Sequence, residues 1–169
     1  IGLNIKPGQA VMTGEGGEAV YIIGPDAFLQ REKTKIIFED NAGAQVMRVI
    51  TGKVLSVFGK NREKTRNLHL ATPTATIGIR GTGCYLEVEE SRTYFCLCYG
   101  EAEVTPKGDP RQKEVIKTQH HDHPISIGAS GERMMAAATV INHTDAELIM
   151  LENAVGRWPP FYGQGGSRY

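Results

Sequence analysis

The sequence predicts an all-β protein, a single domain of many short antiparallel strands of the sandwich or β-roll type. Short apolar runs alternate along most of the chain, and the 20 glycines are spread among them at turns. A helical spacing of apolar residues occurs only near the C-terminal end. At 169 residues the chain has the size of one domain, and it can bury a core without depending on disulfides or a metal for its fold.

Turn signals divide most of the chain into short predicted strands. Pro7-Gly8 separates the first two, and Thr51-Gly52 separates two later ones. A stretch rich in Thr and Gly at residues 71–83 has no helical period and suits strands with tight bends. Glu89-Glu90-Ser91 predicts the turn of a hairpin. The predicted strands are residues 3–14 (two strands), 18–23, 27–29, 35–39, 46–50, 53–58, 68–70, 84–88, 92–104, 114–118 and 134–142.

The C-terminal part carries the one helical pattern. Residues 144–147, Thr-Asp-Ala-Glu, form a capping box ahead of Leu148, Leu151 and Val155 at helical spacing. His143 immediately precedes this box and is interpreted as part of the cap region. The predicted organisation is a β domain over residues 1–143, a helix over 144–157 packed on the same domain, and an extended tail over 158–169.

Composition and motifs argue against several classes of function. Nineteen Lys and Arg balance nineteen Asp and Glu, and a neutral domain without a basic stripe is not expected to bind nucleic acid. The sequence has no Gly-x-Ser-x-Gly elbow, no His-Glu-x-x-His pair and no nucleotide-binding fingerprint, so it predicts no enzyme. It also lacks a run of about 18 apolar residues, so any membrane tether is expected outside the visible chain.

One segment carries a family resemblance. Residues 74–82, Thr-Ala-Thr-Ile-Gly-Ile-Arg-Gly-Thr, precede a strand pair that ends in Tyr-Gly-Glu-Ala-Glu-Val at residues 99–104. This succession resembles the FecR-like domain, named for a ferric-citrate signalling regulator. Residues 7–14 resemble the opening of the same family, so the likeness spans roughly residues 3–105. The resemblance implies an all-β domain outside the cytoplasmic membrane, often tethered by one transmembrane helix, with sensing or binding roles and no known catalysis.

The second half of the chain resembles a particular branch of that family. The branch carries a Cys-x-Cys strand and a downstream His-His cluster, which correspond here to residues 92–124, and it shares the ending at residues 142–148. FecR-like domains that partner sigma-factor systems lack this Cys/His set. The resemblance therefore implies the fold and the extracytoplasmic location more strongly than it implies the signalling role of the namesake.

The Cys-x-Cys strand and the histidine cluster form the concentrated chemistry of the sequence. Cys96 and Cys98 share a face because residues two apart on a strand point the same way. An antiparallel partner strand places His121 opposite Cys96 in one register, and His120 opposite Cys98 in a register one residue longer. Both histidines can contribute only where the strand ends or bulges, and Pro124 favours an end. The predicted metal ligands are Cys96, Cys98, His120 and His121, with Asp122 or His123 orienting a histidine or replacing a ligand.

Two thiolates and two imidazoles suit tetrahedral zinc, copper, or a two-iron iron-sulfur cluster of the Rieske kind, and the sequence does not choose among these cofactors. Two other interpretations stay open. Cys96 and Cys98 could be small apolar residues of a second buried face, or Cys84 could form a disulfide with one of them across the hairpin. Arg80, between glycines, could either hold an anion or brace backbone carbonyls.

The hypothesis from the sequence is a non-catalytic, periplasmic or otherwise extracytoplasmic FecR-like domain that binds a metal centre, in redox chemistry, electron transfer or metal handling. Its first alternative is a scaffolding subunit that docks on a membrane complex through its edge strands and the Trp158-Pro159-Pro160-Phe161 tail. Its second alternative is a ligand-sensing domain for transmembrane signalling, which depends on family analogy alone. All three include a protein partner.

Overall fold

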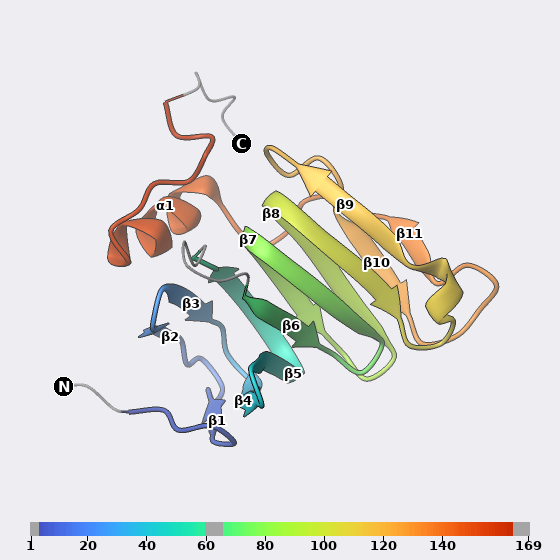
Figure 1. Cartoon of the computed structure of the whole chain (residues 1–169), viewed down its shortest axis with the longest axis horizontal. Helices are drawn as coiled ribbons and strands as arrows, with labels where there is room; N and C mark the ends of the chain where they lie inside the picture. Colours follow the sequence, from blue (N-terminus) through green and yellow to red (C-terminus); the bar gives the residue numbers. More distant parts are fainter. Residues whose placement is uncertain (1–3, 60–65, 164–169) are drawn as a thin grey trace.

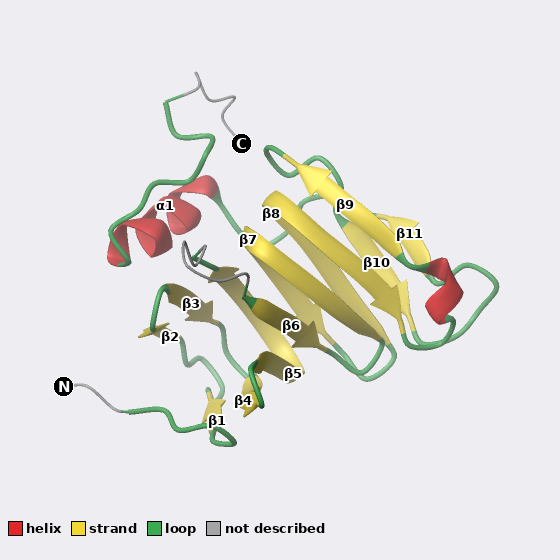
Figure 2. Cartoon of the chain, in the orientation of Figure 1, coloured by secondary structure: helices red, strands yellow, loops and turns green. Residues whose placement is uncertain are grey.

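The computed structural model describes residues 4–59 and 66–163, and within them eleven strands form one open mixed sheet (Figures 1 and 2). A 3₁₀ turn, η1 (Pro110–Gln112), and one α-helix, α1 (Asp145–Ala154), accompany the sheet. The strands are β1 (Ala10–Met12), β2 (Ala19–Ile23), β3 (Asp26–Gln30), β4 (Lys35–Asn41), β5 (Ala44–Val57), β6 (Asn67–Ala71), β7 (Ala75–Val88), β8 (Arg92–Pro106), β9 (Glu114–Thr118), β10 (Ile125–Gly128) and β11 (Met135–Ala137). The all-β fold class is confirmed.

Three long strands, β5, β7 and β8, hold the sheet together. The main order is β1-β4-β5-β6-β7-β8-β10-β11, with β3 paired to β5, β2 paired to β3, and β9 paired to β8. The first half of β5 pairs with β4 and β6, whereas its second half pairs with β3 and β7. Since each long strand changes neighbours along its length, the sheet bends instead of separating into two sheets. The β5–β6 pair is parallel, whereas the sequence predicted antiparallel strands throughout.

The predicted turn at Thr51-Gly52 is a bend inside one strand. The sequence favoured two strands over residues 46–50 and 53–58, but β5 runs through both. Gly52 has a φ of 101°, a conformation that glycine adopts without strain. The register against β4 shifts beside it, and a Cβ on Gly52 would collide with the hydroxyl oxygen of Thr34. The glycine therefore permits a bulge that redirects the strand.

Other predicted elements agree in part. The hairpin around Glu89-Glu90-Ser91 is β7 and β8, and β9 has the predicted bounds. The predicted strand over residues 134–142 is shorter than expected, since β11 covers only Met135–Ala137 and an irregular segment then leads to α1. Of the two strands predicted over residues 3–14, only β1 forms, because residues 4–9 are irregular or in a turn, and residues 1–3 lie outside the described part of the chain.

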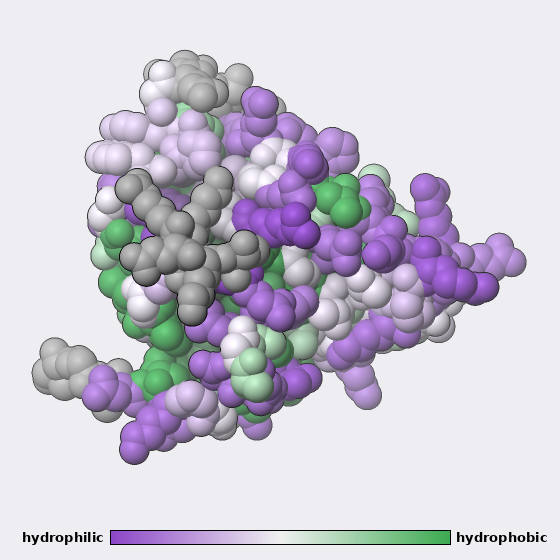
Figure 3. Space-filling view, in the orientation of Figure 1, coloured by the Kyte–Doolittle hydropathy of each residue, from purple (hydrophilic) through white to green (hydrophobic). Residues whose placement is uncertain are grey.

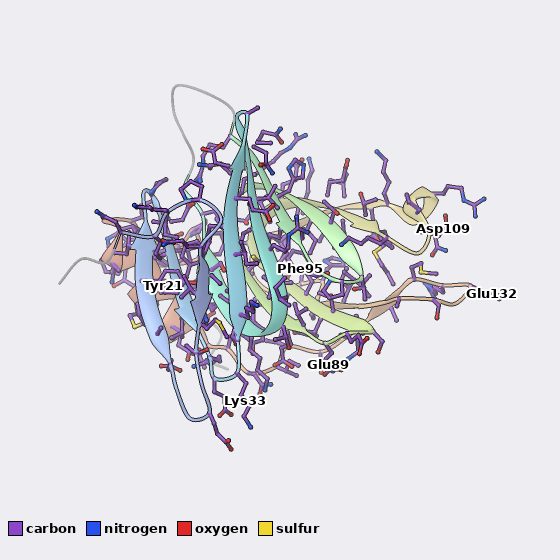
Figure 4. The ribbon with its side chains drawn as sticks, turned by 90° about the horizontal axis from the view of Figure 1, so that it is seen from below. Tyr21, Lys33, Glu89, Phe95, Asp109 and Glu132 are labelled. Atoms are coloured by element: carbon purple, nitrogen blue, oxygen red, sulfur yellow. The ribbon has the colours of Figure 1, made fainter. Side chains whose placement is uncertain are left out.

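Apolar side chains form two clusters on opposite faces of the strands. The main core lies inside the bend of the sheet and includes Phe28, Leu70, Ile77, Phe95 and Leu97. Phe95 lies centrally in Figure 4, whereas Lys33, Glu89, Asp109 and Glu132 lie at loops and turns. The second core consists of Ala27, Leu29, Leu55, Val57, Tyr85, Tyr94, Cys96, Cys98, Tyr99, Leu148 and Leu151. The space-filling view shows a largely polar face, with apolar side chains gathered near β1 to β3 (Figure 3).

Helix α1 covers the second core. The predicted capping box is present, because the Thr144 side chain accepts from the Glu147 backbone N–H and the Glu147 side chain accepts from the Thr144 backbone N–H. Leu148 and Leu151 are fully buried against the sheet. The tail then runs back over the same face, where Phe161 packs against Tyr99. The remainder of the predicted tail, residues 164–169, lies outside the described residues.

In the residues that the structure describes, no helix is both long enough and apolar enough to cross a membrane.

Candidate metal centre

Strand β8 supplies two thiols to the second core. Cys96 and Cys98 alternate with Phe95 and Leu97 along the strand, so their side chains leave the main core and enter the second. The alternation ends at Tyr99, which also lies in the second core. Both cysteines are fully buried. The interpretation of Cys96 and Cys98 as residues of a second buried face is therefore correct as a description of where they lie, and it leaves their chemistry open.

A turn after β9 places a histidine over these thiols. The β8–β9 ladder ends at the pair Gly100 and Thr118, in the longer of the two registers that the sequence allowed. Asp122 closes the turn, since the Thr118 hydroxyl donates to its carboxylate at 2.7 Å and its backbone N–H donates back to that hydroxyl at 3.1 Å. His121 has a φ of 52° and its backbone N–H donates to the Cys98 carbonyl at 3.0 Å. The strand therefore ends before the histidines, as their participation requires.

His143, which the sequence placed only in the helix cap, lies in the same cluster. It belongs to the segment between β11 and α1, is 8% exposed, and stacks on Tyr85 with the ring centroids 4.6 Å apart. Its Nδ1 donates to the Ile141 carbonyl at 2.6 Å. Its Nε2 faces His121, whose Nδ1 is 3.1 Å away.

Four donor atoms lie close together. The sulfurs of Cys96 and Cys98, one nitrogen of His121 and one of His143 all lie within 4.8 Å of one another. The Cys96 Sγ is 3.5 Å from the His121 Nδ1. A tetrahedral ion with bonds of about 2.0 to 2.3 Å separates its donors by roughly 3.3 to 3.8 Å. The sulfur–nitrogen distance of 3.5 Å and the nitrogen–nitrogen distance of 3.1 Å between the two histidines therefore need shifts of only a few tenths of an ångström.

Three of the four predicted ligands meet, and the fourth does not join them. His120 turns its Nε2 to the carboxylate of Asp145, at 2.9 Å from each oxygen, and its ring packs on Phe161. Asp122 is exposed and holds the turn, and His123 is exposed as well. The sequence signal for His143 is its position directly before the capping box, since a helix cap fixes the direction of the residue beside it. Only the packing of α1 shows that this direction leads to the thiols and His121.

The electrostatics of the cluster separate the two thiols. A hydrogen bond from the Cys98 thiol, together with hydrogen bonds from His121 and His143, outweighs burial and lowers the pKa of Cys96 well below its ordinary value. Burial and the neighbouring Cys96 raise the pKa of Cys98. Although burial disfavours its charge, the hydrogen bond to Cys96 and the carboxylate of Asp145 raise the pKa of His121. The surroundings therefore favour the charged forms of Cys96 and His121.

Cys84 lies on the other face of the sheet. It pairs with Leu97, and paired residues share a face, so its side chain joins the main core while Cys96 and Cys98 join the second. All three cysteines are free. The geometry therefore does not support the disulfide across the hairpin.

Arg80 is also accounted for. Its side chain is 74% exposed and forms an ion pair with Glu101 at 3.5 Å, and Glu101 also pairs with Lys117 at 3.0 Å. This is a surface ion pair beside the bulge at Gly81. Neither role predicted for Arg80, holding an anion or bracing backbone carbonyls, describes this contact.

The fold and the site together define an all-β domain with a candidate four-ligand metal centre. No family model matches the chain, and no curated protein matches it. Two crystal structures from Parabacteroides distasonis, both titled a "putative anti-sigma factor", have a similar fold. One, at 1.65 Å, has a TM-score of 0.62 and 12% identity over 78% of this chain and 60% of that one. The other, at 2.50 Å, has a TM-score of 0.62 and 12% identity over 84% of this chain and 71% of that one.

These likenesses show the fold. The chain spans 60% of the length of the first neighbour.

Proposed function

We propose that this chain is a non-catalytic regulatory domain of the FecR-like type, located outside the cytoplasm, that binds one metal ion through Cys96, Cys98, His121 and His143. One observation carries the metal site. Both histidines have their outer nitrogen held by an oxygen acceptor, Asp145 for His121 at 3.1 Å and the Ile141 carbonyl for His143 at 2.6 Å. Histidines that ligate metals have this arrangement, because the outer partner fixes the tautomer and aims the inner nitrogen.

The inner nitrogens need a proton or a cation between them. The His121 Nδ1 and the His143 Nε2 are 3.1 Å apart. The other nitrogen of each ring already donates a hydrogen bond to an outer oxygen, on Asp145 or on Ile141. Two lone pairs repel at that distance unless a proton or a cation lies between them. The nearby sulfurs favour a soft or borderline cation over a proton, since thiolates are strong ligands of such ions.

The geometry favours a single ion of zinc. Two sulfurs and two nitrogens in a tetrahedral arrangement are typical of zinc, with copper as the second choice. A Rieske-type cluster would need two irons and two sulfides between the cysteine pair and the histidine pair. Donor atoms that all lie within 4.8 Å leave too little room for it. A zinc ion would supply no redox chemistry, so the proposal favours a structural or regulatory role over electron transfer.

The ion would join three segments that are distant in the sequence. The ligands come from β8, from the turn after β9, and from the segment before α1. Metal binding would therefore fix the N-terminal end of α1, and with it the tail that follows, against the sheet. The anti-sigma-like fold of the two structural neighbours supports a regulatory role with a protein partner. The FecR-like resemblance supports an extracytoplasmic location and a membrane tether outside the visible chain.

The scaffolding alternative rests on a different feature. Trp158 and Tyr162 stack with centroids 4.0 Å apart, and they are 56% and 52% exposed. Exposed aromatic residues beside rigid prolines are common anchors in protein interfaces. This surface would serve a partner with or without a metal, so the two proposals differ in whether binding to the partner depends on the ion.

A cobalt titration tests the metal site. The protein, stripped of metal and kept reduced, should bind a first equivalent of Co²⁺ with thiolate-to-cobalt charge-transfer absorption. The double variant Cys96→Ser/Cys98→Ser should lose that absorption, and Cys84→Ala should keep it, because Cys84 is equally buried but faces the other core. Charge transfer that survives in the double variant, or none in the unchanged protein, would contradict the site.

Copurification tests the regulatory role. The protein isolated from its own organism, with and without a chelator, should retain its partner only while the metal is bound. Retention that is insensitive to the chelator and lost in Trp158→Ala would favour the scaffold instead.

A further inference from the structure

We propose that His120, His121 and Asp145 form a second metal site that takes a borderline divalent cation such as Zn²⁺, Co²⁺ or Cu²⁺, with the His121 ring bridging the two ions. This inference rests on the proposed function, because the bridge requires the first ion. It assigns a role to His120, which the first site leaves out. It also explains why the histidine pair is adjacent in the sequence.

The three side chains already converge. One nitrogen of His120, one nitrogen of His121 and a carboxylate oxygen of Asp145 all lie within 4.8 Å of one another. The Nε2 of His120 is 2.9 Å from both oxygens of Asp145, and the Nε2 of His121 is 3.1 Å from Oδ1. Two imidazole nitrogens and a carboxylate are a common donor set for zinc and copper.

The left-handed turn makes the bridge possible. The φ of His121 is 52°, and this backbone conformation places its ring between the buried sulfurs and Asp145. The Nδ1 therefore faces the first site and the Nε2 faces the second, so one ring contributes a ligand to each. The ring centroid of His120 lies 4.8 Å from that of His121, and its Nε2 also faces Asp145.

The second ion would replace protons that now lie between the rings and the carboxylate. Each Nε2 donates a hydrogen to Asp145 in the structure. His120 can move its proton to Nδ1 and keep its charge unchanged. His121 cannot, because its Nδ1 would hold the first ion, so its Nε2 proton passes to solvent as the second ion binds. No oxidant or other reactant is needed.

The second site is more exposed to solvent than the first. A surface pocket of about 660 Å³ is lined by its three residues together with Asp122, Pro124 and residues 138–144, which include the first-site ligand His143. The side chains of His120 and Asp145 are 26% and 33% exposed, whereas the cysteines are fully buried. Three protein ligands leave a tetrahedral ion one position for water or an exchanging ligand. The second ion should therefore exchange faster than the first.

The second ion should also bind more weakly. The site offers one carboxylate in place of two thiolates, so it neutralises less of the charge of the ion. Asp145 is the first residue of α1, and the positive end of the helix dipole opposes a cation there. The first site should therefore fill before the second in any titration.

The test is a two-equivalent Co²⁺ titration of the reduced full chain, followed by absorption and electron paramagnetic resonance. The first equivalent should give thiolate charge transfer, and the second should add ligand-field bands without more charge transfer. The second equivalent should also weaken the resonance signal of the first, because a shared imidazole ring couples the two spins. His120→Ala should keep the first equivalent and lose the second. The control His123→Ala, which removes an exposed histidine two residues from the bridge, should keep both.

The outcomes separate the two proposals. No charge transfer at any equivalent contradicts the first site. Charge transfer at the first equivalent with no second equivalent in the unchanged protein overturns only the second site. A second equivalent that persists in His120→Ala, or that leaves the resonance signal of the first unchanged, also overturns it, because the ion would then bind elsewhere. Retention of the first equivalent shows that His120→Ala is folded.

Discussion

Replacing one buried cysteine should remove the stabilisation that metal gives to the domain, whereas replacing another should not. Cys98→Ala and Cys84→Ala each delete one sulfur from a fully buried position. Without metal, each should lower the free energy of unfolding by about 1 kcal/mol, the cost of losing one buried apolar atom. The two variants remove the same atom from equally buried positions. They differ in the core that the sulfur enters and in the hydrogen bond from Cys98 to Cys96.

The size of the metal effect follows from linkage. A ligand present at about 1,000 times its Kd stabilises the folded state by about 4.1 kcal/mol. Changing an outer partner of a metal ligand typically weakens binding 10- to 100-fold, so loss of a direct ligand should cost at least about 100-fold. At the same metal concentration, Cys98→Ala should then gain no more than about 1.4 kcal/mol.

The assay is thermal unfolding of reduced protein with and without Zn²⁺. For a chain of this length 1 kcal/mol corresponds to roughly 2 to 4 °C in Tm. Zinc should therefore raise the Tm of the unchanged protein and of Cys84→Ala by about 8 to 16 °C, and that of Cys98→Ala by no more than about 3 to 6 °C. An equal rise in all three proteins would refute the reasoning, since the ion would then bind without Cys98. A lost response in Cys84→Ala would refute the assignment of faces.

Three further variants test how the helix is held. Leu148→Ala should lower the free energy of unfolding by about 2 to 5 kcal/mol in urea, because a fully buried leucine leaves a cavity; a loss below about 1 kcal/mol would mean that the second core collapses around it. Thr144→Ala removes the capping box and should cost about 0.5 to 2 kcal/mol in the same assay, with no change expected if solvent caps the helix equally well. Glu152→Ala deprives Arg157 of an ion pair at 2.6 Å and the Tyr99 hydroxyl of its acceptor. We expect a loss of about 1 to 3 kcal/mol, and an unchanged midpoint would show that water replaces the carboxylate.

Much of the fold could be read from local patterns. The capping box of α1 and the alternation along β8 depend on residues within a few positions of one another, and the structure has both. The bend at Gly52 was harder, because glycine suits a turn and a bulge equally well. Whether β5 continues depends on strands β3 and β7, which pair with its second half and come from distant parts of the chain.

The candidate site, like the fold, could be predicted only where it depends on local patterns. That Cys96 and Cys98 share a face follows from the period of a strand, and a strand end before Pro124 follows from its missing N–H. The direction of Cys84 did not follow, because the register between β7 and β8 shifts twice near Gly83. A single-residue shift exchanges the faces of a strand, so no local pattern could decide whether Cys84 met the other cysteines.

The sequence by itself determined that two thiols lie together on a strand, that histidines follow at a strand end, and that a capped helix comes after them. Only the tertiary structure decided which histidines meet the thiols. His121 turns inward through a left-handed backbone conformation, and His143 arrives with the packing of α1 on the second core. The physical reason is that periodicity fixes the direction of a side chain relative to its own strand or helix, whereas a metal site requires several elements to converge, and long-range packing sets where they meet.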